Sequence, residues 1–224
     1  MALEVLIERL GVSVSEDLLR QALTHRSYSY EHRNQPNNER LEFLGDSVLG
    51  FVVTGHLFET FGDLDEGKLT KLKNAVVSAK ALAKVGADLG LGEFMLLGRG
   101  EQQTGGQLKV NLLADTFEAI LGAVYVELGI EKARELVLAL VLGPLANPEI
   151  LLESSDPKTT LQERAQSLGL PNPSYGVTHD GPDHDRTFFA TVMVGELEAT
   201  GSARTRKDAE AVAALDALSQ LGTN

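Results

Sequence analysis

The sequence predicts two domains of different class: an all-α helical bundle over residues 1–152 and a small α+β domain over residues 156–224, joined by a linker at residues 153–155. Apolar residues recur with helical spacing through the first two-thirds of the chain, and no strand pattern precedes residue 170. After that point three strand-like runs lie between two helical segments. The chain of 224 residues is long enough for two such domains.

The helices of the first domain are predicted from apolar spacing and from end signals. The first ends at Gly11, and the second has Ser15 as a candidate N-cap with two acidic residues in its first turn. Leu69, Leu72 and Val76 share one face of a later helix. The predicted helices cover residues 2–10, 16–25, 38–58, 67–90, 110–127 and 131–142, with a glycine-rich polar loop at 98–107.

The second domain is predicted to have the order α-β-β-β-α. Asp156 and Pro157 form an N-cap and N1 pair that begins a helix ending at Gly169, with Leu161, Ala165 and Leu168 on its apolar face. Alternating or β-branched runs then predict strands at residues 174–179, 186–194 and 197–203, separated by a turn at 180–185 and by Gly195. A final helix begins near Arg206 and ends at Gly222.

The segment "NNERLEFLGDSVLG" places three carboxylates on one side of the third helix. At 100° per residue, Glu39, Glu42 and Asp46 fall within about 60° of one another. The opposite side is apolar and is predicted to face the core, with Leu41, Leu44, Val48, Phe51 and Val52.

The same construction recurs in "NLLADTFEAILGAVY". Asp115 and Glu118 share one side of this helix, while Leu113, Phe117, Ile120 and Val124 occupy the other. The small residues Ala119 and Gly122 flank the acids, so another helix or a ligand can approach closely.

These acids have two interpretations. A solvated helix face is the simpler one, but like charges three or four residues apart destabilise a helix by roughly 0.2–0.5 kcal/mol per pair. No Lys or Arg shares their side of the helix to offset this. Helical bundles build metal sites from inward-pointing carboxylates, and oxygen ligands favour Mg²⁺ or Mn²⁺. We therefore predict a divalent-metal site suited to phosphodiester hydrolysis.

The composition of the chain indicates its cellular compartment and its possible partners. The chain has no cysteine, which fits a reducing compartment, and its N-terminus lacks the basic region of a signal peptide. The longest apolar runs are too short to span a bilayer, so we expect a cytoplasmic protein without a membrane partner. The net charge of −12 argues against nucleic-acid binding unless local basic clusters supply it.

At these motifs the sequence resembles the bacterial ribonuclease III family. "NERLEFLGDSVL" resembles the family signature, "LADTFEAILGAVY" its second carboxylate motif, and "LGRGEQQTGG" and "DEGKLTKLKNAVVS" further family segments. The tail, from "DPKTTLQERAQSLG" to "TRKDAEAVAALDAL", is similar to a double-stranded-RNA-binding domain. The resemblance implies the ribonuclease III fold and Mg²⁺-dependent cleavage of double-stranded RNA by a homodimer, in rRNA and mRNA processing. The products implied carry 5′-phosphate and 3′-hydroxyl ends, and Mn²⁺ can substitute for Mg²⁺.

The resemblance also assigns residue roles in the first domain. It implies that metal is bound by Glu42, Asp46, Asp115 and Glu118, with Asp46 and Glu118 most directly tied to hydrolysis. Glu39 and Glu66 match two auxiliary acids of the family, although Glu66 by itself reads as an acid at a helix N-terminus. Phe43 lies on the acidic side of its helix, either as a core-edge residue or, as the family implies, at the dimer interface.

In the tail the resemblance assigns RNA contacts to Gln162, Glu163, His184, Arg206 and Lys207. Taken singly, His184 reads as a loop histidine and the basic pair as a solvated helix start. The sequence departs from the family pattern at Ala203, usually glycine, and at Arg206 in a usual lysine pair. Asp180, Asp183 and Asp185 add negative charge to the loop, so we expect weaker and more salt-sensitive RNA binding than in a basic homologue.

The alternative function is a regulatory protein that binds double-stranded RNA without cutting it. The presence of every matched carboxylate argues against this alternative, because a protein that only binds RNA does not need mutually repelling acids. Dependence of RNA cleavage on a divalent metal discriminates between the two.

Overall fold

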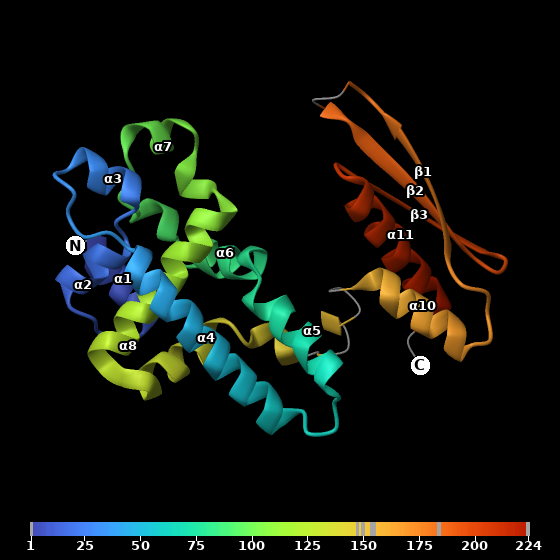
Figure 1. Ribbon diagram of the computed structural model, residues 1–224, viewed down its shortest axis with the longest axis horizontal. Helices are drawn as coiled ribbons and strands as arrows, with labels where there is room; N and C mark the ends of the chain where they lie inside the picture. The colour runs from blue at the N-terminus through green and yellow to red at the C-terminus, as the bar shows by residue number, and fades with distance from the viewer. Residues whose placement is uncertain (1, 147, 149–150, 153–155, 183–184, 223–224) are drawn as a thin grey trace. The chain divides into compact units, whose positions relative to one another are not determined.

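The computed structural model describes residues 2–146, 148, 151–152, 156–182 and 185–222 (Figure 1). Contacts divide the chain into two compact units, Met1–Ala146 and Asn147–Asn224. The predicted linker at residues 153–155 lies outside the described residues, so the domain limits stay a prediction. Each unit is described here by itself.

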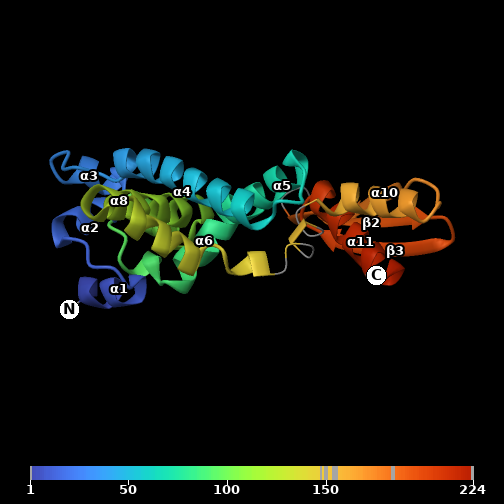
Figure 2. The same cartoon turned by 90° about the horizontal axis from the view of Figure 1, so that it is seen from below.

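The first unit is built of helices, as the sequence predicts (Figures 1 and 2). Within its described residues the β-type pairing consists of one isolated bridge, between Thr24 and Leu96. Short 3₁₀ turns cover Leu91–Glu93, Gly106–Leu108 and Gly143–Ala146. The α-helices are α1 (Ala2–Leu10), α2 (Glu16–Ala22), α3 (Arg26–Glu31), α4 (Glu39–Thr60), α5 (Glu66–Val77), α6 (Ala79–Asp88), α7 (Arg99–Gln103) and α8 (Val110–Leu140).

Two long helices, α4 and α8, cross at a pair of glycines in the centre of this unit. A Cβ atom built on Gly45 would lie 1.8 Å from the carbonyl oxygen of Glu118, and one on Gly122 would lie 2.1 Å from the carbonyl oxygen of Leu41. Only glycine permits backbones to approach this closely. The small residue at position 122 therefore admits a second helix, one of the two possibilities that the sequence left open.

The buried face of α4 differs from the predicted one at one aromatic residue. Leu41, Val48 and Val52 are buried as predicted, but the predicted core residue Phe51 has 71% of its surface exposed. The buried face is rotated toward Gly45, Leu49 and Val53, because the contact with α8 centres on Gly45. The prediction for Phe51 is wrong.

The observed helices depart from the predicted ones at Ser78 and in the predicted loop at 98–107, and agree with them at Gly129. The helix predicted over residues 67–90 is divided at Ser78, whose extended backbone ends α5 and whose side chain caps α6 by accepting a hydrogen bond from the Ala81 amide. The predicted loop at 98–107 contains the short helix α7. Gly129, with φ of 82°, kinks α8 between the two helices predicted there.

Among the described residues, α4 is the helix whose length and composition would suffice to cross a membrane. A helix in the core of a globular protein passes the same test, and α4 packs along α8. The expected absence of a membrane partner stays a prediction.

The second unit has an antiparallel sheet in the order β1-β2-β3, with two helices packed against one another (Figure 1). The predicted order is confirmed. The elements are α10 (Pro157–Ser167), β1 (Ser174–Asp180), β2 (Thr187–Val194), β3 (Leu197–Ala203) and α11 (Arg206–Leu221).

The core of this unit depends on small residues. Ala209 and Ala213 of α11 are fully buried, and a Cβ on Gly201 of β3 would lie 2.3 Å from the Ala213 amide nitrogen. The helix can therefore lie directly on the strand. Leu161 and Ala165 of α10 are buried as predicted, whereas Leu168 is 45% exposed because it caps the helix end.

Candidate active site

Three of the predicted metal ligands meet where α4 crosses α8. Glu42, Asp115 and Glu118 each offer one carboxylate oxygen, and these oxygens all lie within 4.8 Å of one another. All three side chains are half-buried. The close approach at Gly45 and Gly122 brings the acids of the two helices together, since each helix presents its acids beside its glycine.

The surroundings raise the pKa of each carboxyl in this cluster. Burial, with the charges of Asp46, Asp115 and Glu42, raises the pKa of Glu118 to about 7. Burial and the charge of Asp115 raise the pKa of Glu42, and burial raises that of Asp115. Raised carboxyl pKa values mean that the charged forms lack compensation from the protein itself. A cation bound among them would supply it.

The other predicted acids lie outside this group of three. Asp46 is exposed on α4, and its charge contributes to the raised pKa of Glu118. Glu39 is exposed at the start of α4, where its amide and side chain hydrogen-bond the side chain of Asn37. Glu66 is exposed in the first turn of α5. Their assigned roles stay predictions.

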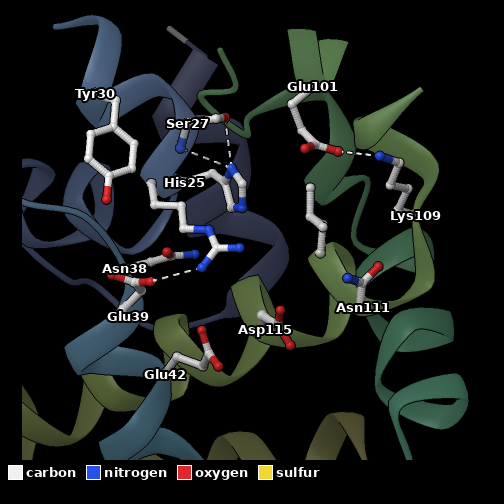
Figure 3. Close-up of a pocket in the computed structure, with 12 residues that line it drawn as sticks. His25, Ser27, Tyr30, Asn38, Glu39, Glu42, Glu101, Lys109, Asn111 and Asp115 are labelled. Carbon is white, nitrogen blue, oxygen red and sulfur yellow. Dashed lines mark hydrogen bonds and ion pairs between the residues drawn. The ribbon is translucent and has the colours of Figure 1, made fainter. Parts of the chain in front are cut away.

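A cavity of about 550 Å³ opens beside the carboxylates (Figure 3). Figure 3 shows Glu42 and Asp115 near one another, with His25 and Glu101 from other segments facing the same space. The residues that line the cavity are His25, Arg26, Ser27, Tyr30, Asn38, Glu39, Glu42, Glu101, Lys109, Asn111, Leu112 and Asp115.

Two basic side chains in the lining are paired with acids. An Arg26 guanidinium nitrogen lies 3.7 Å from a Glu39 carboxylate oxygen, and Lys109 forms an ion pair with Glu101. The Lys109 hydrogen bond holds the pKa of Glu101 below its usual value. The cavity thus combines an acidic cluster with two cations that can face a phosphate.

His25 is fixed in this wall by its neighbours. Its Nδ1 lies 2.8 Å from the Ser27 hydroxyl oxygen, which accepts a hydrogen bond of 2.9 Å from the Gly98 amide. Burial lowers the pKa of His25, which favours the neutral ring. The sequence did not predict roles for His25, Arg26 and Lys109, although "THRS", residues 24–27, lies at the end of the helix predicted over residues 16–25.

The predicted RNA-contacting residues lie in the second unit. Gln162 and Glu163 are exposed on α10, and Arg206 and Lys207 are exposed at the start of α11. His184 lies outside the described residues. In the first unit, Phe43 has 78% of its surface exposed, and its place at a dimer interface stays a prediction.

Comparison with protein families matches both units. Residues 15–145 match the family described as ribonuclease-III-like, and residues 157–221 match the double-stranded RNA binding motif. The two matches follow the same order as the two predicted domains.

Comparison with individual proteins gives the same result over nearly the whole chain. A ribonuclease 3 of Leifsonia xyli subsp. xyli is 52% identical over 217 residues, covering 96% of this chain and 92% of the relative. A ribonuclease 3 of Thermobifida fusca is 50% identical, covering 92% and 87%. The crystal structure of the ribonuclease III nuclease domain of Campylobacter jejuni is 42% identical in sequence, with a TM-score of 0.59. The match covers 63% of this chain and 94% of the Campylobacter jejuni chain.

Proposed function

The chain belongs to the ribonuclease III family, and we propose that it cuts double-stranded RNA with divalent metal held by Glu42, Asp115 and Glu118. Its class of activity is that of an endoribonuclease. The observation that carries the proposal for the cutting site is the meeting of three carboxylates at the crossing of α4 and α8. Asp46, one turn along α4, completes the proposed ligand set.

The donor set fits a hard divalent cation. Every proposed ligand is a carboxylate, and the described part of the group includes no sulfur or imidazole donor. Mg²⁺ takes oxygen ligands, carboxylates among them, and Mn²⁺ accepts the same donors. The raised pKa values support the fit, since a cation would offset the repulsion that causes part of them. We propose Mg²⁺ as the physiological ion, with Mn²⁺ able to replace it.

The residues around the cluster are suited to hold a phosphodiester. Arg26 and Lys109 line the cavity beside Glu42 and Asp115, so they can orient the RNA backbone toward the carboxylates. Without metal the pKa of Glu118 is about 7, so binding of a cation near neutral pH would displace a proton from its carboxyl. When bound, the divalent ion supplies an activated water and stabilises charge on the leaving oxygen. The proposed products carry 5′-phosphate and 3′-hydroxyl ends.

We also propose that the protein works as a homodimer. Phe43, Phe51 and Phe58 are 78%, 71% and 74% exposed on α4. At 100° per residue they lie within about 80° of one another, so they form one aromatic stripe along the helix. An apolar stripe of this kind is typical of a protein–protein interface. A solved relative from Campylobacter jejuni is described as having a region involved in dimer formation, with 42% identity to this chain and a TM-score of 0.58.

The setting of the reaction is part of the proposal. A chain without cysteine suits a reducing compartment, and we propose that it acts in the cytoplasm. Processing of rRNA and mRNA is the proposed role, since folded transcripts supply the duplexes that this class of enzyme cuts.

The test of the proposal is cleavage of an end-labelled RNA duplex by the purified protein. We expect short duplex products with Mg²⁺ and none with a chelator. Glu118→Gln should cut at least ~100-fold more slowly, because loss of ~3 kcal/mol of charge stabilisation corresponds to about that factor. The matched control is Glu131→Gln, an exposed acid beyond the kink of the same helix, which should cut normally. Binding of duplex RNA without cleavage in Mg²⁺ or Mn²⁺ would favour the regulatory alternative.

A further inference from the structure

The cavity beside the carboxylates has two neutral polar side chains in its wall besides its charged ones. The two basic side chains of the wall, Arg26 and Lys109, are each paired with an acid. His25 and Asn38 line the same cavity, and neither belongs to the group of three carboxylates (Figure 3). Both are therefore available for contact with a ligand.

Backbone hydrogen bonds fix the segments that carry His25 and Asn38. The His25 amide donates to the Leu96 carbonyl at 3.0 Å, and the Asn38 amide donates to the Thr24 carbonyl at 2.9 Å. Because Thr24 directly precedes His25, the start of α3 is held against the start of α4. Side chains on a backbone fixed in this way can bind a ligand at a low cost in conformational entropy.

The neighbours of His25 determine which of its ring nitrogens carries the proton. The Ser27 amide can only donate, and it donates to His25 Nδ1 at 3.3 Å. The Ser27 hydroxyl oxygen accepts from the Gly98 amide, which leaves its own hydrogen for the same Nδ1 at 2.8 Å. Nδ1 is thus an acceptor, so the neutral ring carries its proton on Nε2.

This tautomer makes His25 a hydrogen-bond donor toward the cavity. Among the described residues the Nε2–H has no hydrogen-bond partner, and neither Glu42 nor Asp115 accepts from it. A protonated Nε2 has no lone pair for a metal ion, and a neutral ring does not repel one. The negatively charged oxygen of a phosphodiester is the acceptor that such an N–H binds well.

The side chain of Asn38 supplies a second neutral donor. Asn38 is only 3% exposed and lines the cavity, yet its side chain has no hydrogen bond within the part of the chain that the structure describes. Buried polar side chains are nearly always hydrogen-bonded in folded proteins. A ligand in the cavity is therefore the expected partner of this amide.

We propose that the His25 Nε2–H and the Asn38 side-chain amide donate hydrogen bonds to non-bridging oxygens of the phosphodiester that is cut. These two residues would contact the substrate directly and take no part in binding the metal. The inference rests on the proposed function, because an RNA phosphodiester must enter the cavity.

Two substitutions of His25 separate contact with substrate from a structural role. His25→Asn keeps an acceptor for the Ser27 amide, since asparagine caps helices well, but its shorter side chain cannot carry an N–H to the position of Nε2. His25→Gln can reach that position but lacks the acceptor at Nδ1. We expect His25→Asn to melt normally and to cut roughly 10- to 100-fold more slowly at saturating protein. His25→Gln should melt at a lower temperature and keep most of the rate.

The contact itself is tested with RNA duplexes that carry one sulfur at a non-bridging position of the cut linkage, each configuration being measured separately. Sulfur accepts hydrogen bonds less well than oxygen, so the unmodified protein should cut at least one of the two more slowly. His25→Asn should show a smaller effect of sulfur in that configuration, because its hydrogen bond is already lost. Asn38→Ala should slow cutting and reduce the effect of sulfur in the same way.

The control is His32→Asn, at the other end of α3 and outside the cavity wall, which should cut normally. The inference is wrong if the cutting rates of the two His25 variants follow their melting temperatures. An increase in the Mg²⁺ concentration that His25→Asn needs for half its maximal rate would also overturn it, because that places His25 in the metal site. If the unmodified protein cuts no duplex RNA in Mg²⁺ or Mn²⁺, the proposed function fails instead.

Discussion

Glu42, Asp115 and Glu118 repel one another, and the fold holds them together because the opposite faces of their helices are buried. Phe117 on α8 is fully buried, and Leu41 on α4 is 7% exposed. Burial of one large apolar side chain contributes roughly 1.5–3 kcal/mol, which exceeds the repulsion between one pair of helix charges. The repulsion within the cluster thus destabilises the fold, and burial of the surrounding core offsets this. A bound metal ion would reduce the repulsion.

The pKa of Glu118 predicts how stability depends on pH. Its carboxyl binds a proton more tightly in the folded state, with a pKa of about 7 against a usual 4.5. The free energy of unfolding therefore falls as pH rises from about 4.5 through about 7. Glu118→Gln removes this loss. In chelator at pH 8 we expect the variant to be more stable than the unmodified protein by about 1–2 kcal/mol, after allowance for partial exposure.

Thermal melts in chelator at pH 5 and pH 8 check this expectation, since the difference between the two proteins should grow with pH. Adding Mg²⁺ at pH 8 should raise the melting temperature of the unmodified protein more than that of Glu118→Gln. A difference between the proteins that does not change from pH 5 to pH 8 would argue against the raised pKa.

Sequence reasoning located the carboxylates because their placement on a helix is local. A period of 3.6 residues is enough to turn Glu42 about 100° away from Leu41 and Glu118 about 100° away from Phe117. Arg26 and Lys109 reach the same cavity only through tertiary packing, since they are 83 positions apart in the sequence. No helical periodicity connects them, so this part of the site was not predictable.

Among the secondary-structure elements, the crossing of α4 and α8 decides the geometry of the site. Gly45 and Gly122 each face a carbonyl oxygen of the other helix, so the two backbones are in direct contact. Any side chain at either position would push the helices apart and separate Glu42 from Glu118.

Gly45→Ala should therefore lower the free energy of unfolding by about 3 kcal/mol or more, because the added methyl meets backbone rather than a flexible side chain. Gly55→Ala is the matched control on the same helix, where an added Cβ meets no atom within 4 Å. That change should stabilise the protein by roughly 0.5–1 kcal/mol, since alanine favours helix. Denaturant unfolding measures both variants. Equal stability of the two would contradict the close crossing.

The boundaries that the sequence missed have local causes that periodicity does not reveal. Ser78 leaves its neighbours with helical spacing, yet its own extended backbone ends one helix and its hydroxyl begins the next. Phe51 has the polarity of a core residue, but the direction of the α8 contact leaves it on the surface. In contrast, the three strands of the second unit follow a period of two and were predicted within a residue at each end.

For the whole molecule, the net charge of −12 raises the question of how it binds a polyanion. Most Lys and Arg side chains of the second unit have partners within the protein, and Asp185 in the turn at residues 180–185 is paired with Arg204. Because few cations are free to contact phosphates, few counterions are released from the RNA on binding. The affinity for RNA should therefore depend only weakly on salt concentration. The pairing thus argues against the greater salt sensitivity expected from the sequence, while weak binding is still expected.

The aromatic stripe on α4 predicts the assembly state. Phe51→Ser should shift the protein from dimer toward monomer in size-exclusion chromatography with light scattering, while melting of the monomer changes little because Phe51 is already exposed. Val212→Ser, at a 43% exposed position in the second unit, is the control and should remain dimeric. If a variant with serine at Phe43, Phe51 and Phe58 together is still dimeric, the dimer interface does not involve this stripe.

We propose that the repelling carboxylates are the ligands of a catalytic metal. The most direct test of this proposal is a crystal of the protein soaked in Mn²⁺, examined for anomalous scattering. We expect a peak in contact with carboxylate oxygens of Glu42, Asp115 and Glu118, and loss of that peak in Glu118→Gln. A crystal of active protein with no Mn²⁺ peak at the crossing of α4 and α8 would contradict it.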